Sequence, residues 1–176
     1  MKLIKNLWIV LFVELTFLSP VHSYELPQPV SPEDISKILK NEFRFVDDEK
    51  LFGRSDYWQS PEEFWNRKAG DCEDYALFAQ QALTHLGFEA YVISIYGEGG
   101  YAHTIAVFKQ NGKFNVVNED RLLNFQADSL EEALTQVFHQ WTWASIAERR
   151  EGRGWPIRIL SNTAARDERP LTPLPL

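Results

Sequence analysis

The dipeptide Asn111-Gly112 restricts the fold more than any other feature, because it stands between two runs of β-forming residues. Asn-Gly favours the two-residue turns that join antiparallel strands. The turn therefore predicts a hairpin of strands 101–109 and 113–118, with Gln110 opposite Lys113. Residues 88–96 are also β-branched and aromatic and end at a glycine-rich turn, so we expect another strand before the hairpin.

Helices are predicted on both sides of these strands. A serine followed by proline and two acidic residues begins one helix at Ser31 and another at Ser60. A longer helix is expected over 72–86, with Gly87 as its C-terminal stop, and a fourth begins near Asp128. Helices combined with an antiparallel sheet predict the α+β class.

Charge and cysteine content exclude several classes of protein. The 176 residues carry a formal net charge of −7, so a general nucleic-acid-binding surface is not expected. The single cysteine, Cys72, excludes an intramolecular disulfide, a cysteine-rich zinc module and an iron–sulfur cluster.

Residues 1–23 have the three-part layout of a secretory signal peptide: early lysines, an apolar run over 7–18 and small or turn-forming residues before the cleavage point. We therefore expect an exported protein, periplasmic or secreted. The apolar run is shorter than the ~20 residues that span a membrane, so membrane attachment is expected only through an uncleaved leader. The rest divides into one domain over 24–160 and a loose tail over 161–176.

Cys72 is the candidate nucleophile. It stands in the first turn of its helix, where unpaired N–H groups and the helix dipole favour a negative charge and lower a thiol pKa. Helical periodicity places Cys72 at the head of an apolar stripe and turns Glu73 and Asp74 away from it. The alternative is that Cys72 is a small, inert core residue.

His103 is the candidate base for this thiol. The hairpin register places His103 opposite Asp120 and diagonal to Asn118 on one face of the sheet. Either side chain could accept the imidazole N–H and fix its tautomer. The alternative is a structural histidine beside a polar strand end. His85 is expected on the polar face of its helix, and nothing in the sequence brings His139 close.

The motifs resemble those of the bacterial transglutaminase-like cysteine peptidases, within the papain-like and transglutaminase-like superfamily. The resemblance covers roughly Tyr57 to Leu123. It rests on Tyr57-Trp58, Pro61-Glu62-Glu63-Phe64, Gly70-Asp71-Cys72-Glu73-Asp74-Tyr75-Ala76, Leu86-Gly87 and the strand-borne His103. It implies a papain-like core in which the nucleophile begins a helix packed on an antiparallel sheet.

The resemblance also implies a Cys-His-Asn/Asp triad, with Cys72 as nucleophile and His103 as base. The family usually has aspartate as third member, where this chain has Asn118; Asp120 is the alternative. The Cys72 backbone N–H is the expected first oxyanion donor, and Gln59 a candidate second donor.

Some members of the family bind calcium through the acidic residues that flank the cysteine. Asp71, Glu73 and Asp74 occupy those positions, and carboxylate oxygens suit calcium. The alternative is that these carboxylates only cap the helix. No cofactor is expected to be required for the chemistry itself.

These residues indicate an exported, monomeric thiol hydrolase that cleaves an amide or peptide bond of a protein or peptide substrate through an acyl-enzyme. An amine in place of water as acceptor would make it a protein-crosslinking transglutaminase. Two non-catalytic functions remain open: an inactive module that binds peptide or cell-wall fragments, and a structural or membrane-tethered partner protein with an inert Cys72.

Overall fold

The computed structural model describes residues 28–147 and 157–162. The predicted signal peptide, residues 1–23, lies outside this range, as does the predicted tail from residue 163 onward. None of the described helices has the length and apolar character needed to cross a membrane.

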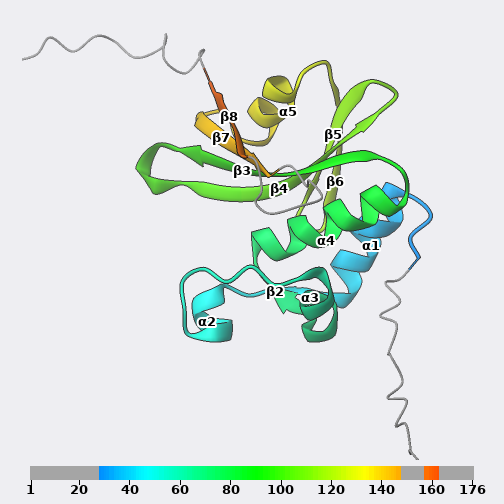
Figure 1. Ribbon diagram of the computed structural model, residues 1–176, viewed down its shortest axis with the longest axis vertical. Helices are drawn as coiled ribbons and strands as arrows, with labels where there is room; N and C mark the ends of the chain where they lie inside the picture. The colour runs from blue at the N-terminus through cyan, green and yellow to red at the C-terminus, as the bar shows by residue number, and fades with distance from the viewer. Residues whose placement is uncertain (1–27, 148–156, 163–176) are drawn as a thin grey trace, which may run out of the picture.

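An antiparallel sheet of six strands, in the order β6-β5-β4-β3-β7-β8, forms the centre of the described structure (Figure 1). The strands are β3 (Glu89–Gly97), β4 (Ala102–Gln110), β5 (Lys113–Asn118), β6 (Arg121–Ala127), β7 (Trp141–Ala147) and β8 (Ile157–Ser161). The turn η1 (Glu98–Gly100) joins β3 to β4. The predicted hairpin is confirmed: Gln110 pairs with Lys113, and Asn111 and Gly112 have positive φ angles of 53° and 81°.

The described residues form five α-helices, which lie on the two sides of this sheet. They are α1 (Pro32–Glu42), α2 (Asp48–Phe52), α3 (Pro61–Arg67), α4 (Cys72–His85) and α5 (Leu130–Val137). The side chains of Ser31 and Ser60 accept hydrogen bonds from the first turns of α1 and α3, as their sequences predict. A short parallel pair, β1 (Arg44–Phe45) and β2 (Ala69–Gly70), ties the segment after α1 to the start of α4.

Three features differ from the sequence prediction. The expected loop after α1 contains α2, and strands β6 to β8 were not predicted. Ser161, where the predicted tail starts, belongs to β8, and the buried Asn162 donates a hydrogen bond to the Trp141 carbonyl at 2.9 Å.

Alternating side chains of the sheet belong to two separate cores. On β4, Ala106 and Phe108 pack with α1, α3 and α4, whereas Ile105 and Val107 pack with α5. Figure 1 shows α1 and α4 on one side of the sheet and α5 on the other. The α+β class is thereby confirmed.

Aromatic packing fixes α4 against its surroundings. Phe78 and Leu83 of α4 are almost completely buried, and Phe43 and Phe64 stack on each other with ring centroids 4.4 Å apart. Full burial of each such side chain contributes about 1.5–3 kcal/mol. The position of α4, and therefore of its first residue Cys72, is set by this core.

Candidate active site

Cys72 is the first residue of α4, and Asp71 is the N-cap. The half-buried thiol donates a hydrogen bond to Oε2 of Glu73 at 3.0 Å. The backbone of Thr104 also forms a hydrogen bond with the sulfur. Because Thr104 directly follows His103 on β4, the end of α4 brings the candidate nucleophile to the strand position beside the candidate base.

This contact is made where β4 extends past its neighbour β5. The pairing between the two strands stops at Ala106–Val117, whereas β4 begins at Ala102. Strand β5 ends at Asn118, and the chain turns at Glu119, which has a positive φ of 51°. In the ladders of the described residues, the start of β4 therefore pairs with β3 alone, and its other edge is open to the N-terminus of α4.

His103 is held by the last residue of β5. Its Nε2 lies 2.7 Å from Oδ1 of Asn118, and both side chains are half-buried. An amide oxygen can only accept a hydrogen bond, so Nε2 carries the hydrogen of the neutral ring. Nδ1 then keeps its lone pair and is the ring atom that can take a proton.

The expected pairing of His103 with Asp120 is wrong, although the predicted register of the hairpin is right. Asp120 lies in the two-residue turn between β5 and β6, so the strand ends before reaching the position opposite His103. Its charge acts on α4: burial, followed by the charges of Asp120 and Glu119, raises the pKa of Tyr75 to about 12. Of the two candidates for third member, Asn118 contacts the imidazole.

The surroundings of Cys72 oppose thiolate formation, contrary to the expectation from the helix dipole. Burial, followed by the hydrogen bond to Glu73 and its charge, raises the pKa of Cys72 to about 12, despite the hydrogen bond from Thr104. Glu73 does not turn away as helical periodicity predicts, since it contacts the sulfur. Asp74 does not reach the sulfur, but it is fully buried against Gln59 and does not lie on a polar face. Capping contacts decide side-chain directions in this first turn. The thiol is therefore protonated at neutral pH.

Gln59 belongs to a buried network rather than to an oxyanion site. Its side-chain Nε2 donates to Oδ2 of Asp74 at 2.6 Å and to the Ala69 carbonyl at 3.0 Å. Both amide hydrogens are thus engaged, and the expectation that Gln59 supplies an oxyanion donor is not supported. Gln59 instead anchors its loop to α4, because its backbone N–H donates to the other oxygen of Asp74 at 2.8 Å.

Gly70 is required by the same network. A Cβ at this position would lie 2.1 Å from Oδ2 of Asp74 and 2.7 Å from Nε2 of Gln59. A side chain at residue 70 would therefore displace the contact between the loop and α4.

Carboxylates converge on the N-terminus of α4. Three overlapping groups have ligand atoms within 4.8 Å of one another: Asp71–Cys72–Glu73, Asp48–Asp71–Asp74 and Asp48–Asp56–Glu73. Of the three residues proposed from the sequence, Asp71 lies with Glu73 in one group and with Asp74 in another. Asp48 and Asp56 were missed, because only the pairing of β1 with β2 brings their acid-rich loop to α4, and this pairing leaves no periodic pattern in the sequence.

Burial and repulsion from neighbouring carboxylates raise the pKa values of Asp71 and Asp74 in this cluster. Burial, and then repulsion from Glu73, raises the pKa of Asp71 to about 8. Burial also raises the pKa of Asp74 to about 6, despite its hydrogen bonds from Gln59. One oxygen of Asp48 and one of Asp71 are buried without a hydrogen-bond partner. Several hard oxygen donors with unused lone pairs are the donor set that calcium prefers.

The two other described histidines lie outside this site. His85 is exposed, and its Nδ1 lies 2.8 Å from the carbonyl of Gln81 on the same helix. His139 is also exposed, beyond the end of α5. His103 is therefore the described histidine that adjoins Thr104, the strand residue whose backbone contacts Cys72.

Comparison with known sequences agrees with this geometry. The profile of a family described as bacterial transglutaminase-like cysteine proteinase matches residues 30–151. The match spans the residues on which the sequence resemblance rests, and confirms that resemblance. No curated protein matches the chain.

Solved structures of LapG from Legionella pneumophila are similar to this chain. The calcium-bound form is 19% identical with a TM-score of 0.47, and the alignment covers 70% of this chain and 65% of LapG. A second LapG structure is 22% identical with a TM-score of 0.48, and the alignment covers 70% of this chain and 67% of LapG. The EGTA-treated form is 20% identical with a TM-score of 0.45, and the alignment covers 70% of this chain and 68% of LapG. The chain thus spans about two thirds of the length of LapG.

We predict that Gly70→Ala destabilises the protein, because the new methyl group would overlap the Asp74 carboxylate. Forced overpacking of this kind costs about 1–3 kcal/mol. The free energy of unfolding should fall by that amount in urea titrations, whereas Ser55→Ala, at an exposed loop position, should change it little. Equal stabilities of the two variants would show that the Gln59–Asp74 network adapts freely.

We also predict that the metal-free protein loses stability as the pH rises. The folded state holds protons on Asp74 up to a pKa of about 6 and on Asp71 up to about 8, whereas their ordinary value is 3.8. Between these values the folded state binds more protons than the unfolded state, so the free energy of unfolding decreases with pH. In EGTA, the melting temperature should fall between about pH 5 and about pH 8.5. Asp71→Asn should make this fall smaller, and an unchanged slope would contradict the assignment.

Proposed function

Because the chain belongs to the bacterial transglutaminase-like cysteine proteinases, we propose that it hydrolyses a peptide bond of a protein substrate at Cys72. His103 acts as the base, and Asn118 orients it. The observation that carries the proposal is the 2.7 Å contact between Nε2 of His103 and Oδ1 of Asn118, beside the strand position that Cys72 contacts.

Acylation begins when Nδ1 of His103 takes the thiol proton and the Cys72 sulfur attacks the scissile carbonyl carbon. The oxyanion that forms would accept a hydrogen bond from the Cys72 backbone N–H at the start of α4. The C–N bond then breaks, and the departing amine takes the proton from His103. Cys72 is left as a thioester.

Deacylation uses the same groups in reverse. His103 accepts a proton from water as the water oxygen attacks the thioester carbonyl. The C–S bond breaks, the sulfur recovers the proton, and the carboxylic acid product leaves. Throughout, Asn118 keeps the hydrogen on Nε2, so Nδ1 remains the atom that exchanges protons.

We propose further that the acidic cluster binds calcium. Asp48, Asp71, Glu73 and Asp74 would supply its oxygen ligands, with Asp56 at the exposed side. The two buried oxygens without partners, on Asp48 and Asp71, support this assignment. The bound cation would neutralise the carboxylates around Cys72 and so favour its ionised form.

The proteinase proposal is tested by digesting a peptide library derived from a bacterial proteome, in calcium, with mass-spectrometric detection of new termini. We expect Cys72→Ser and His103→Ala to lose about 10³-fold or more in kcat/KM, because each removes a reacting group. Asn118→Ala should lose about 10- to 100-fold, whereas Asn118→Asp, which keeps the acceptor oxygen, should retain most activity. His85→Ala, at an exposed histidine of α4, is the matched control and should behave as wild type.

Three results would point to a different function of this fold. Cleavage that survives Cys72→Ser would contradict the proposal. Release of ammonia with incorporation of an added primary amine, in place of new termini, would indicate a transglutaminase. Peptide binding without any turnover would indicate an inactive binding module.

The calcium proposal is tested by calorimetric titration of the EGTA-stripped protein with calcium chloride. Asp48→Asn and Asp71→Asn should each weaken binding about tenfold or more, because each removes a charged ligand. Asp128→Asn, an exposed carboxylate in the loop before α5, should leave binding unchanged. Identical affinities in all three variants would exclude the cluster as the site.

A further inference from the structure

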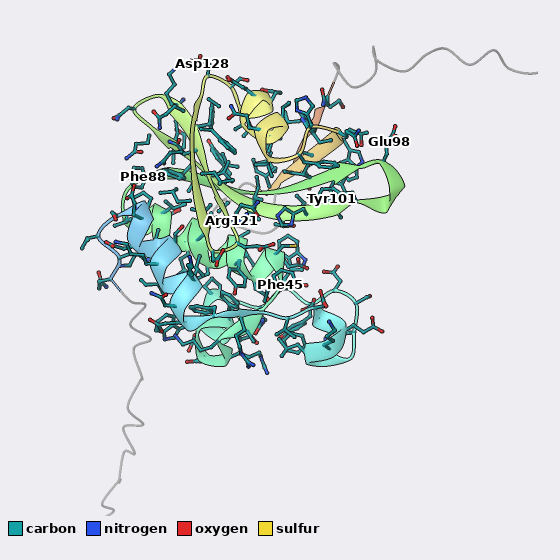
Figure 2. The ribbon with its side chains drawn as sticks, turned by 180° about the vertical axis from the view of Figure 1, so that it is seen from behind. Phe45, Phe88, Glu98, Tyr101, Arg121 and Asp128 are labelled. Carbon is teal, nitrogen blue, oxygen red and sulfur yellow. The ribbon has the colours of Figure 1, made fainter. Side chains whose placement is uncertain are left out.

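Tyr101 is a large aromatic side chain that belongs to neither of the two cores. It remains 37% exposed, and it stands between the glycine turn and the start of β4. In Figure 2, Glu98 lies at the tip of the β3–β4 hairpin and Tyr101 nearer to the body of the molecule. The exposed part of the ring is therefore accessible to a ligand.

The Tyr101 ring is nonetheless held in a fixed position. It stacks on Phe138 with ring centroids 3.9 Å apart and an interplanar angle of 20°. Phe138 in turn rests on Gly97, where a Cβ would lie only 2.3 Å from its ring. The backbone N–H of Gly97 also donates to the Tyr101 carbonyl at 3.0 Å, closing the turn. Gly97 therefore allows Phe138 to support Tyr101 from behind.

This supported ring lies beside the candidate catalytic residues. Tyr101 is two residues before His103, on the same side of the strand, and their ring centroids are 6.3 Å apart. Burial, followed by the charges of an ionised Cys72 and of Glu119, raises the pKa of Tyr101, so its hydroxyl lies near the nucleophile as well. An aromatic wall that is rigid, half-exposed and next to the reacting groups is a feature of ligand sites.

We propose that Tyr101 forms a substrate subsite, in which its ring packs against an apolar side chain of the peptide next to the scissile bond. The inference rests on the proposed proteinase function and adds the chemical class of residue that the cleft takes there. The exposed part of the Tyr101 ring is apolar, and removing apolar area from water favours an apolar partner.

Trp143 provides a matched control. It is 40% exposed, nearly the same as Tyr101, and its ring stacks on Tyr96 with centroids 3.7 Å apart. Trp143 pairs with Tyr96 across β3 and β7, which places both rings on the opposite face of the sheet from Tyr101. The two exposed aromatic residues thus test the two faces of the same end of the sheet.

The test compares cleavage of the peptide library by wild type, Tyr101→Phe, Tyr101→Ala and Trp143→Ala. Wild-type sites should be enriched in apolar residues at one position next to the cut. Tyr101→Ala should lose this enrichment and, on the best wild-type peptide, raise KM about tenfold while kcat changes less than about threefold. Tyr101→Phe, which keeps the ring, should retain the preference, and so should Trp143→Ala.

Four results would overturn the inference, each in a recognisable way. An unchanged profile in Tyr101→Ala with active wild type removes the subsite and leaves the proteinase function standing. If only Trp143→Ala loses the preference for apolar residues, the subsite lies on the sheet face that carries Trp143. A basic or acidic preference in wild type contradicts the proposed apolar class. No cleavage by wild type overturns the proteinase function, and the subsite with it.

Discussion

The early end of β5 is the constraint on which the candidate site depends. Because the β4–β5 ladder stops at Ala106–Val117, the first residues of β4 keep an open edge. The N-terminus of α4 contacts that edge at Thr104, and the last residue of β5, Asn118, remains free to bond His103. A β5 strand two residues longer would continue the ladder past the site and close the edge against α4.

The acidic surroundings of Cys72 make its thiol less reactive. Without a cation, burial and then the neighbouring carboxylates raise the pKa of Asp71 to about 8 and that of Cys72 to about 12, so the site favours protonated, unreactive forms. The packing of α4 and the Gln59–Asp74 network hold these groups together despite their repulsion. Such an arrangement makes reactivity depend on charge neutralisation, which the proposed calcium ion would provide.

Local signals predicted the elements that carry the site. The Asn111-Gly112 turn fixed the hairpin register, and the serine caps and Gly87 fixed three helices, because each acts within a few residues. The sequence could not show that Glu119 turns the chain, since positive φ at a non-glycine residue has no strong signature. The Asp120 assignment failed for that reason.

Long-range packing decided the remaining features of the site. Asp48 and Asp56 reach α4 through the two-residue pairing of β1 and β2, which is too short to leave a pattern. The side-chain amide of Gln59 could donate a hydrogen bond to an oxyanion. In the folded protein it is buried, and its amide hydrogens bond Asp74 and the Ala69 carbonyl instead. Tyr101 had no motif at all, and its position follows from Phe138, far along the chain.

The most direct test of a Cys72–His103 pair is the rate of iodoacetamide modification of Cys72 as a function of pH, in saturating calcium. A reactive pair predicts rapid modification near neutral pH in wild type, slower modification in Asn118→Ala, and loss of the neutral-pH reaction in His103→Ala. A rate that rises only at high pH and is the same in all three proteins would contradict it. Cys72 would then be an inert thiol on a proteinase fold.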